Sequence, residues 1–289
     1  MIAPRFALLR PRHWVKNLFV LGPLVFAQRL THLATLVEAL QAFAAFCLIS
    51  SAVYAVNDVL DAAADRLHPI KRHRPVAAGR IRPAAALRLA AALAVAGLGW
   101  AATLGWPFLA TCAGYLVLNL LYSQVLKHVA FLDVASIAAG FLLRVVGGAL
   151  AIRVVISPFL LLCTFWLAAL LGLGKRHHEL RMMREASAQT RTSLAGYNAR
   201  SLLAAEWVAA VATVLSYLFY TVSPQTVSKF HSVQLVWTLP FPVLGILRYL
   251  HLVRSRSDRT PTDALVTDAP SLLNGLMWTA MVVWILYGN

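Results

Sequence analysis

Nine long apolar runs limit what this chain can fold into more than any other feature of its sequence. They fall near residues 14–29, 33–56, 83–103, 107–125, 130–151, 155–174, 201–222, 232–253 and 271–288. A transmembrane α-helix needs about 20 such residues. Only 13% of the residues are charged, against about a quarter in soluble proteins. The sequence therefore predicts an all-α polytopic membrane protein with a bundle of nine transmembrane helices.

The basic residues predict the orientation of these helices. Most of the 26 Lys and Arg residues fall at the N-terminus or in loops on that side of the predicted bundle, whereas only Arg29, Arg153 and Lys229 fall in the opposite loops. By the positive-inside rule, the N-terminus and the loops rich in Lys and Arg face the cytoplasm. This predicts an inner (cytoplasmic) membrane protein. Most carboxylates lie on the same side. Mixed charge there favours a site for a phosphate substrate and its metal, since attraction to anionic lipid needs positive charge alone.

An acidic motif closes the second apolar run. In the segment Asn57 to Asp65, the three carboxylates of Asp58, Asp61 and Asp65 share one face of a helix over about 10 Å. Magnesium prefers a few carboxylates and completes its shell with water and substrate phosphate. The motif predicts a magnesium site with a bound diphosphate, and a solvated acidic helix end is the alternative.

Basic side chains near this motif are candidates for phosphate binding. Lys71, Arg72 and Arg74 follow within a few residues, and guanidinium groups can hold phosphate oxygens in a bidentate manner. Lys16 lies near the start of the first run, in a basic segment that begins at Arg10. Its neighbour Trp14 also suits ordinary anchoring at the membrane interface.

Polar residues inside the apolar runs form a second group of candidates. Tyr122 belongs to a polar stripe on one helical face, formed with Tyr115, Asn119 and Ser123. This stripe could equally serve hydrogen bonding between helices. Asp133 and Arg144 lie eleven residues apart, on one face of a helix and about 16 Å apart in height. Ionisable groups at such depth usually face a wet cavity, so Arg144 is expected to reach a phosphate or to pair inside the bundle.

Two further cytoplasmic loops carry charged residues. The loop after the sixth run begins with Lys175, Arg176 and Glu179 and reaches Tyr197, and the last loop holds Asp263 and Asp268. Asp268 could also cap the following helix. The three cysteines lie singly in three apolar runs, which is typical of small buried hydrophobic residues.

Several motifs together resemble one family. The chain resembles the UbiA superfamily of membrane prenyltransferases over nearly its whole length. The resemblance rests on the nine predicted spans and on two motifs, NDxxDxxxD (Asn57 to Asp65) and HPxKRxRP (His68 to Pro75). Within this superfamily, the chain is similar to the decaprenyl-phosphate phosphoribosyltransferases. The motifs that carry this similarity are RPxxWxKN (Arg10 to Asn17), LDVxxxxxGFxLR (Leu132 to Arg144), GKRxxEL (Gly174 to Leu180) and the Tyr197-Asn198 pair.

The resemblance implies a single domain over residues 1–289, with cytoplasmic active-site loops near 57–82, 175–200 and 254–270. It implies Mg²⁺-dependent transfer of 5-phosphoribosyl from phosphoribosyl diphosphate to a polyprenyl (decaprenyl-type) phosphate, releasing pyrophosphate. The lipid product would serve synthesis of a lipid-linked arabinose donor and of the cell wall.

The resemblance also implies roles for individual residues. The metal and the donor would be held by Asn57, Asp58, Asp61 and Asp65. Donor phosphate and the remaining pocket would involve Lys16, Lys71, Arg72, Arg74, Tyr122, Arg144, Lys175, Arg176 and Tyr197. The membrane is an expected partner, nucleic acid is not, and the oligomeric state is open.

The chain departs from ordinary members of the superfamily in the loop after the sixth run. Where a second DxxxD-type motif is expected, it offers Lys175, Arg176 and a single Glu179, which suits an anionic acceptor better than another metal. The alternatives are an aromatic or quinone-precursor prenyltransferase of the same fold that uses a prenyl diphosphate, and a membrane transporter or lipid-binding protein. Inverted repeats, typical of many transporters, are not evident.

Overall fold

The computed structural model describes residues 4–67, 71–186, 196–255, 264–265 and 267–288. Every regular element in these ranges is a helix, and no strand is found there. The chain folds as two compact units. Unit 1 comprises Met1–Val125 and Leu143–Val155, and unit 2 comprises Leu126–Leu142 and Ile156–Asn289. The prediction of one domain over residues 1–289 stays a prediction.

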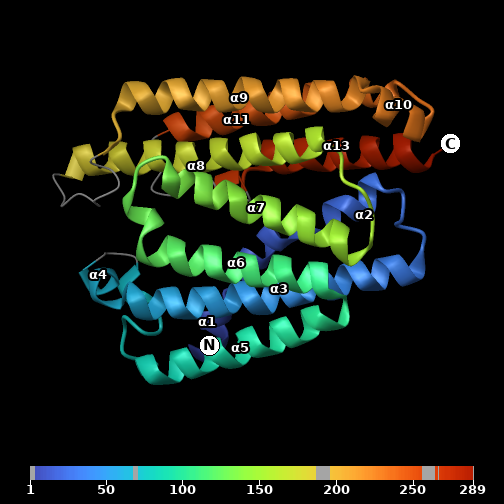
Figure 1. The fold of residues 1–289 in the computed structure, drawn as a ribbon. Coiled ribbons are helices and arrows are strands. Elements are labelled where there is room, and N and C mark those ends of the chain that lie inside the picture. The colour runs from blue at the N-terminus through green and yellow to red at the C-terminus, as the bar shows by residue number, and fades with distance from the viewer. Residues whose placement is uncertain (1–3, 68–70, 187–195, 256–263, 266, 289) are drawn as a thin grey trace. The chain divides into compact units, whose positions relative to one another are not determined.

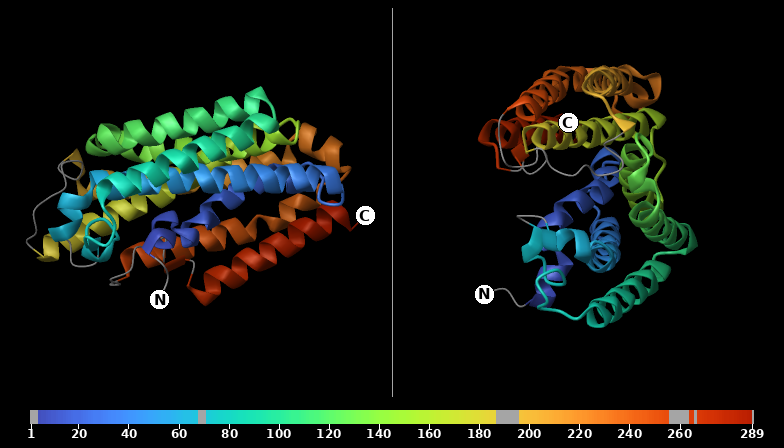
Figure 2. Two further views of the ribbon diagram at one scale, coloured as in Figure 1. Left: turned by 90° about the horizontal axis from the view of Figure 1, so that it is seen from below. Right: turned by 90° about the vertical axis from the view of Figure 1, so that its left-hand side faces the viewer.

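Unit 1 is organised around one long central helix, α3. This helix packs against η1, α1, α5 and α6, and α5 runs beside it (Figures 1 and 2). The elements of the unit are α1 (Pro4–Leu9), η1 (Pro11–Leu21), α2 (Gly22–Phe26), α3 (Leu33–Leu60), α4 (Ala62–Leu67), η2 (Lys71–His73), α5 (Pro83–Thr103), α6 (Trp106–Gln124) and the second half of α7 (Leu132–Ala151).

Unit 2 is built on α8 and α9, which lie side by side, with α11 packed against α8 and α13 packed against α11. Its elements are η3 (Leu126–His128), the first half of α7, α8 (Pro158–Ala186), α9 (Ala199–Val222), α10 (Pro224–Phe230), η5 (Gln234–Thr238), α11 (Pro240–Arg254) and α13 (Ala269–Tyr287). Proline opens α8, α10 and α11, because the first turn of a helix needs no N–H donor.

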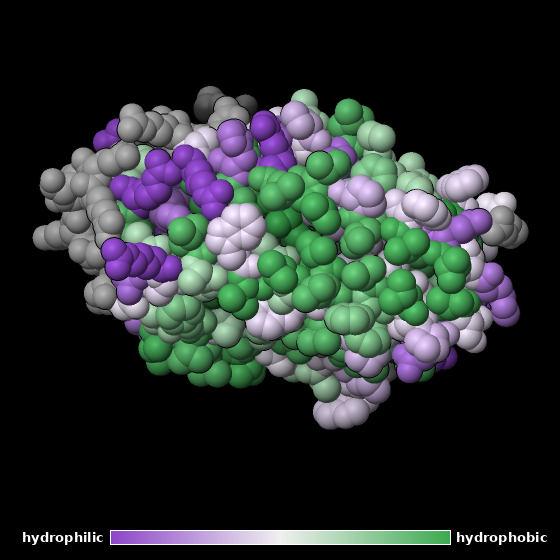
Figure 3. Space-filling view, turned by 90° about the horizontal axis from the view of Figure 1, so that it is seen from above, coloured by the Kyte–Doolittle hydropathy of each residue, from purple (hydrophilic) through white to green (hydrophobic). Residues whose placement is uncertain are grey.

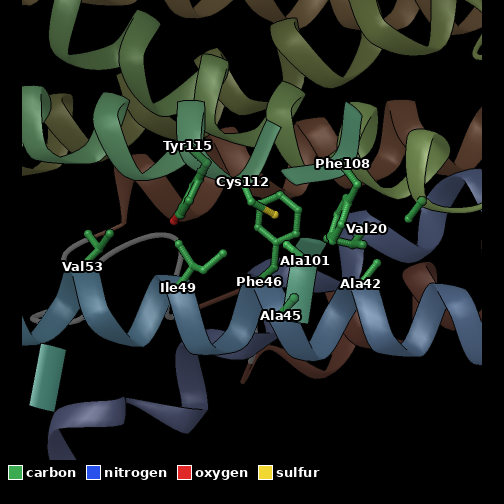
Figure 4. Close-up of a cluster of buried hydrophobic side chains, with 11 residues drawn as sticks. Val20, Ala42, Ala45, Phe46, Ile49, Val53, Ala101, Phe108, Cys112 and Tyr115 are labelled. Atoms are coloured by element: carbon green, nitrogen blue, oxygen red, sulfur yellow. The ribbon is translucent and has the colours of Figure 1, made fainter. Parts of the chain in front are cut away.

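The core of unit 1 forms where aromatic rings from α3 and α6 meet (Figure 4). The ring of Phe46 packs edge-on against Phe108 and Tyr115, with centroids 5.9 and 5.5 Å apart, a favourable geometry for aromatic pairs. Gly147 of α7 permits this arrangement. A Cβ atom at Gly147 would lie 2.9 Å from the Phe46 ring, so a larger residue would push α7 away from α3.

Eight described helices are long and apolar enough to cross a membrane, and each coincides with one of the predicted spans from the second to the ninth. The first predicted span, residues 14–29, is not one long α-helix. The 3₁₀ helix η1 covers its first half, as far as Leu21, and the short α2 continues from Gly22 to Phe26. Pro23 lies in the first turn of α2, and a proline has no N–H to continue the hydrogen bonding of a helix that would run through it. A ninth spanning helix is therefore not confirmed.

Large hydrophobic side chains remain exposed along the helices. One face of the molecule is hydrophobic through its middle, and hydrophilic residues gather toward its ends (Figure 3). On α9 alone, Trp207, Val208, Val211 and Phe219 are each more than two-fifths exposed. In water such a continuous surface would cause aggregation, whereas in a bilayer it faces lipid tails. The chain is a multi-pass membrane protein.

Candidate active site

The acidic motif lies where α3 ends and α4 begins, and it keeps helical hydrogen bonding through the junction. The Asp61 amide donates to the Asn57 carbonyl over 2.9 Å, and the Asp65 amide donates to the Asp61 carbonyl over 2.8 Å. Asp58 and Asp65 are buried and Asp61 is half-buried. The segment is thus helical on both sides of Asp61, and the shared face of the three carboxylates stays a prediction.

Two arginines hold the buried carboxylates. Arg10 Nη2 pairs with Asp58 Oδ1. Arg74 Nη1 lies 2.6 Å from Asp65 Oδ2, and its Nε lies 4.0 Å from Asp58 Oδ1. Arg74 was predicted at the site, but sequence reasoning missed Arg10. Its position in the RPxxWxKN segment was the available signal, and Lys16 was chosen there instead.

The second oxygen of Asp58 suits a cation. Oδ2 is buried and has no hydrogen-bond partner among the described residues. No cluster of three or more His, Cys, Asp or Glu side chains in the described ranges could hold a metal alone. Magnesium does not require one, because water and substrate phosphates complete its octahedral shell. The carboxylates of Asp58 and Asp65 fit such an ion bound together with a diphosphate.

Asn57 and the polar stripe of α6 lie together in unit 1. Asn57 Oδ1 accepts a hydrogen bond from Ser123 Oγ, which also contacts the Asn119 carbonyl at 2.7 Å. Tyr122 is half-buried on the same helix. The hydrogen bond of Asn57 joins α3 to α6, as expected of polar groups between membrane helices.

The remaining predicted cations of unit 1 differ in exposure. Lys16 and Lys71 are half-buried, and Arg72 is exposed. His68 of the HPxKRxRP motif lies outside the described residues.

Arg144 lies inside unit 1. Its Nε donates to Asn17 Oδ1 and its Nη2 donates to the Tyr115 hydroxyl, both over 2.8 Å. Its guanidinium carbon also lies 4.6 Å from the centre of the Tyr115 ring. Asn17 additionally donates to Ser50, so the last residue of RPxxWxKN links η1, α3 and α7. These contacts favour the alternative in which Arg144 pairs inside the bundle.

Among the described residues of unit 2, Arg176 is the best buried cation. Only 1% of its side chain is exposed, its Nε lies 2.6 Å from Asp133 Oδ2, and its Nη1 pairs with Glu179. The Tyr197 hydroxyl donates to Asp133 Oδ1 over 2.6 Å. Burial, and then this hydrogen bond to a carboxylate, raise the pKa of Tyr197. Sequence reasoning placed Asp133 with Arg144, whereas the structure gives it Arg176 and Tyr197 as partners.

Unit 2 also contains a buried hydrogen-bonded pair that sequence reasoning missed. Glu206 is fully buried in α9, and its Oε1 lies 2.9 Å from His177 Nδ1 on α8. Its Oε2 has no hydrogen-bond partner among the described residues. A lone carboxylate within an apolar run was the available signal, because such residues rarely face lipid. Lys175, next to this pair along α8, is half-buried.

Two loop residues in the second half of the chain cap the N-termini of helices. Asp268 caps α13 by accepting from the Ser271 amide at 3.0 Å, as the alternative interpretation proposed. Arg248 donates a hydrogen bond to each carboxylate oxygen of Asp268. These hydrogen bonds hold the pKa of Asp268 well below its usual range. Asn198 caps α9 through a capping box with Ser201. Asp263 lies outside the described residues.

Comparisons with known proteins agree with this architecture. The model of the UbiA prenyltransferase family matches residues 18–282. The decaprenyl-phosphate phosphoribosyltransferase of Corynebacterium glutamicum is 32% identical, over 96% of this chain and 85% of the relative. The enzyme of the same name from Mycobacterium tuberculosis strain H37Rv is also 32% identical, over 95% of this chain and 91% of the relative.

The solved structure of a UbiA homolog from Archaeoglobus fulgidus bound to DMAPP and Mg²⁺ has the same fold. The TM-score is 0.73 at 18% identity, with 98% of this chain and 99% of that chain covered. A helical membrane fold, a family match over most of the chain and close relatives named as transferases lead to one conclusion: this chain belongs to the UbiA prenyltransferase family and is a membrane transferase.

Proposed function

We propose that this protein transfers 5-phosphoribosyl from phosphoribosyl diphosphate to a polyprenyl phosphate of the decaprenyl type, at the cytoplasmic face of the inner membrane. The observation that carries the proposal is the buried pair of Asp58 and Asp65, held by arginines, with one Asp58 oxygen left for a cation. The names of the relatives supply the donor and acceptor classes. The distribution of Lys and Arg supports the cytoplasmic orientation.

The residues of the acidic motif would hold the metal. Mg²⁺ would be bound by Asp58, Asp61 and Asp65, with Asn57 beside them. When bound, the ion would neutralise charge on the diphosphate and ease its departure. Arg74, Lys71 and Arg72 would bind donor phosphates, because guanidinium and ammonium groups stabilise the charge that develops on leaving pyrophosphate.

The acceptor needs little activation from the protein. A phosphate monoester is largely ionised near neutral pH, so its oxygen can attack C1 of ribose without a strong base. The bond from C1 to the pyrophosphate oxygen breaks as the bond to the lipid phosphate forms. Lys175 stays the candidate for holding the lipid phosphate.

The test uses purified protein with Mg²⁺, labelled phosphoribosyl diphosphate and decaprenyl phosphate. We expect labelled lipid and one pyrophosphate for each transfer. An aromatic prenyltransferase would instead consume a prenyl diphosphate and an aromatic acceptor, and a transporter or lipid-binding protein would release no pyrophosphate.

The Asp58→Ala variant tests the role of the acidic motif. Transfer should fall by at least 100-fold, since removing one electrostatic stabiliser typically has an effect of about that size. Glu38→Ala is the matched control, because it removes a carboxylate from the other end of α3. Full transfer by a folded Asp58→Ala protein would refute the proposed metal site.

A further inference from the structure

Arg10 occupies an unusual backbone position beside the acidic motif. It precedes the first turn of η1 with φ 49° and ψ 60°, in the left-handed region that residues other than glycine seldom adopt. Such a conformation persists only where surrounding contacts maintain it. The guanidinium carbon lies 5.1 Å from the centre of the Tyr54 ring, and Nη2 pairs with Asp58. Tyr54 and Asp58 are four residues apart on α3, so one side chain spans a single face of that helix.

Arg10 is the main partner of the Asp58 charge. Arg74 approaches the same carboxylate only to 4.0 Å, and its close contact is with Asp65 at 2.6 Å. Asp58 is 1% exposed and its Oδ2 is unpartnered among the described residues. A buried carboxylate with one oxygen paired and one unpaired is incompletely stabilised, so it attracts a further cation.

A divalent metal on Asp58 would meet the guanidinium of Arg10 at short range. Two cations on one carboxylate repel each other, and burial strengthens the repulsion because little water screens it. The side chain of Arg10 is 18% exposed, so it can also be reached by an anion. A diphosphate arriving with the metal would accept bidentate hydrogen bonds from the displaced guanidinium.

We propose that Arg10 competes with the divalent metal for Asp58 and thereby makes metal binding depend on a diphosphate. When no diphosphate is bound, Arg10 neutralises Asp58 and weakens the metal site. When a diphosphate is present, Arg10 moves to the phosphate oxygens, and the two ligands bind with positive coupling. This inference rests on the proposed function only in requiring a diphosphate donor.

The experiment measures Mn²⁺ binding by electron paramagnetic resonance on detergent-purified protein, with and without inorganic pyrophosphate. Without pyrophosphate, Arg10→Gln should bind Mn²⁺ about tenfold more tightly than the natural protein, a factor typical of coupled sites. Pyrophosphate should tighten Mn²⁺ binding strongly in the natural protein and much less in Arg10→Gln. Arg12→Gln is the matched control, because Arg12 is exposed two residues away, and it should behave as the natural protein does.

An Arg10→Gln protein that binds Mn²⁺ no more tightly than the natural protein would overturn the proposal. If that variant does not fold, Tyr54→Leu removes the ring under the guanidinium and should tighten Mn²⁺ binding by a smaller factor. Unchanged affinity in Tyr54→Leu would then overturn it. Mn²⁺ and pyrophosphate binding require neither ribose nor lipid, so the outcome is separate from whether the protein transfers phosphoribose.

Discussion

Arg176 illustrates how burial changes the role of a single residue. Its position among Lys175 and two histidines suggests a cation that binds phosphate, yet its guanidinium is enclosed with Asp133 and Glu179. A buried ion pair contributes little net stability compared with apolar packing, but removing one partner leaves an uncompensated buried charge. The contacts of Arg176 therefore make it a residue that joins α7 to α8 within unit 2.

Replacing Arg176 with alanine should destabilise the protein. We expect the free energy of unfolding to fall by about 3–5 kcal/mol, the usual cost of breaking a buried ion pair. Thermal or denaturant unfolding in detergent would measure it. Arg200→Ala is the control, since Arg200 is exposed at the start of α9 and should change stability by roughly 0.5 kcal/mol at most. Normal stability with weakened substrate binding in Arg176→Ala would restore the phosphate-binding role.

The residues of the acidic motif could be predicted because their chemistry depends on local spacing. Asp58, Asp61 and Asp65 would share one face of a continuous helix. The structure keeps the hydrogen bonds between Asn57 and Asp61 and between Asp61 and Asp65, although α3 ends just before Asp61. The partners of Arg10, Asp133 and Glu206 could not be predicted. Each comes from an element distant along the chain, and periodicity within one helix says nothing of which helix lies opposite.

At the level of elements, glycines control how closely helices approach. A Cβ atom at Gly148 of α7 would collide with the carbonyl oxygen of Val20 in η1. The same addition at Gly114 of α6 would meet nothing within 4 Å. Gly148 is thus required for packing inside unit 1, whereas Gly114 is not.

A matched pair of alanine substitutions tests this difference. Gly148→Ala should destabilise the protein by about 1–3 kcal/mol through overpacking. Gly114→Ala should stabilise it by up to roughly 1 kcal/mol, because alanine loses less backbone entropy in a helix. Melting temperatures in one detergent should move in opposite directions, and a common shift would contradict the packing role of Gly148.

The first predicted span shows the limit of hydropathy at this level. Its residues are apolar enough for a spanning helix, but its backbone is not one long α-helix. Pro11 and Pro23 both lie in or beside the segment, and η1 and α2 take the place of one long helix there. Prolines in the other eight predicted spans lie in the first turn of an α-helix. In the eighth predicted span, Pro240 follows η5 and opens α11.

For the whole molecule, the orientation in the membrane is the property most open to direct test. The predicted cytoplasmic side carries most Lys and Arg residues, including the loop from Lys71 to Arg82. The turn between α7 and α8 is predicted to face the other side. Val155 in that turn is 93% exposed, and Ala78 in the basic loop is also exposed.

Single-cysteine labelling in spheroplasts would determine this orientation. In a background with Cys47, Cys112 and Cys163 replaced by alanine, Val155→Cys should react with a membrane-impermeant maleimide. Ala78→Cys should react only after the membrane is permeabilised. The reverse pattern would place the acidic motif on the outer side and would rule out a cytoplasmic donor.

The sequence by itself determined the properties that depend on composition and on local spacing: eight of the nine predicted apolar spans, the position of the acidic motif at the end of the second span, and the family to which the chain belongs. Only the tertiary structure decided which charged and polar side chains pair with one another. Arg10 meets Asp58, Arg176 meets Asp133, and His177 meets Glu206 because helices distant in sequence pack together. A buried charge must find a partner, but the partner depends on which helix lies opposite it.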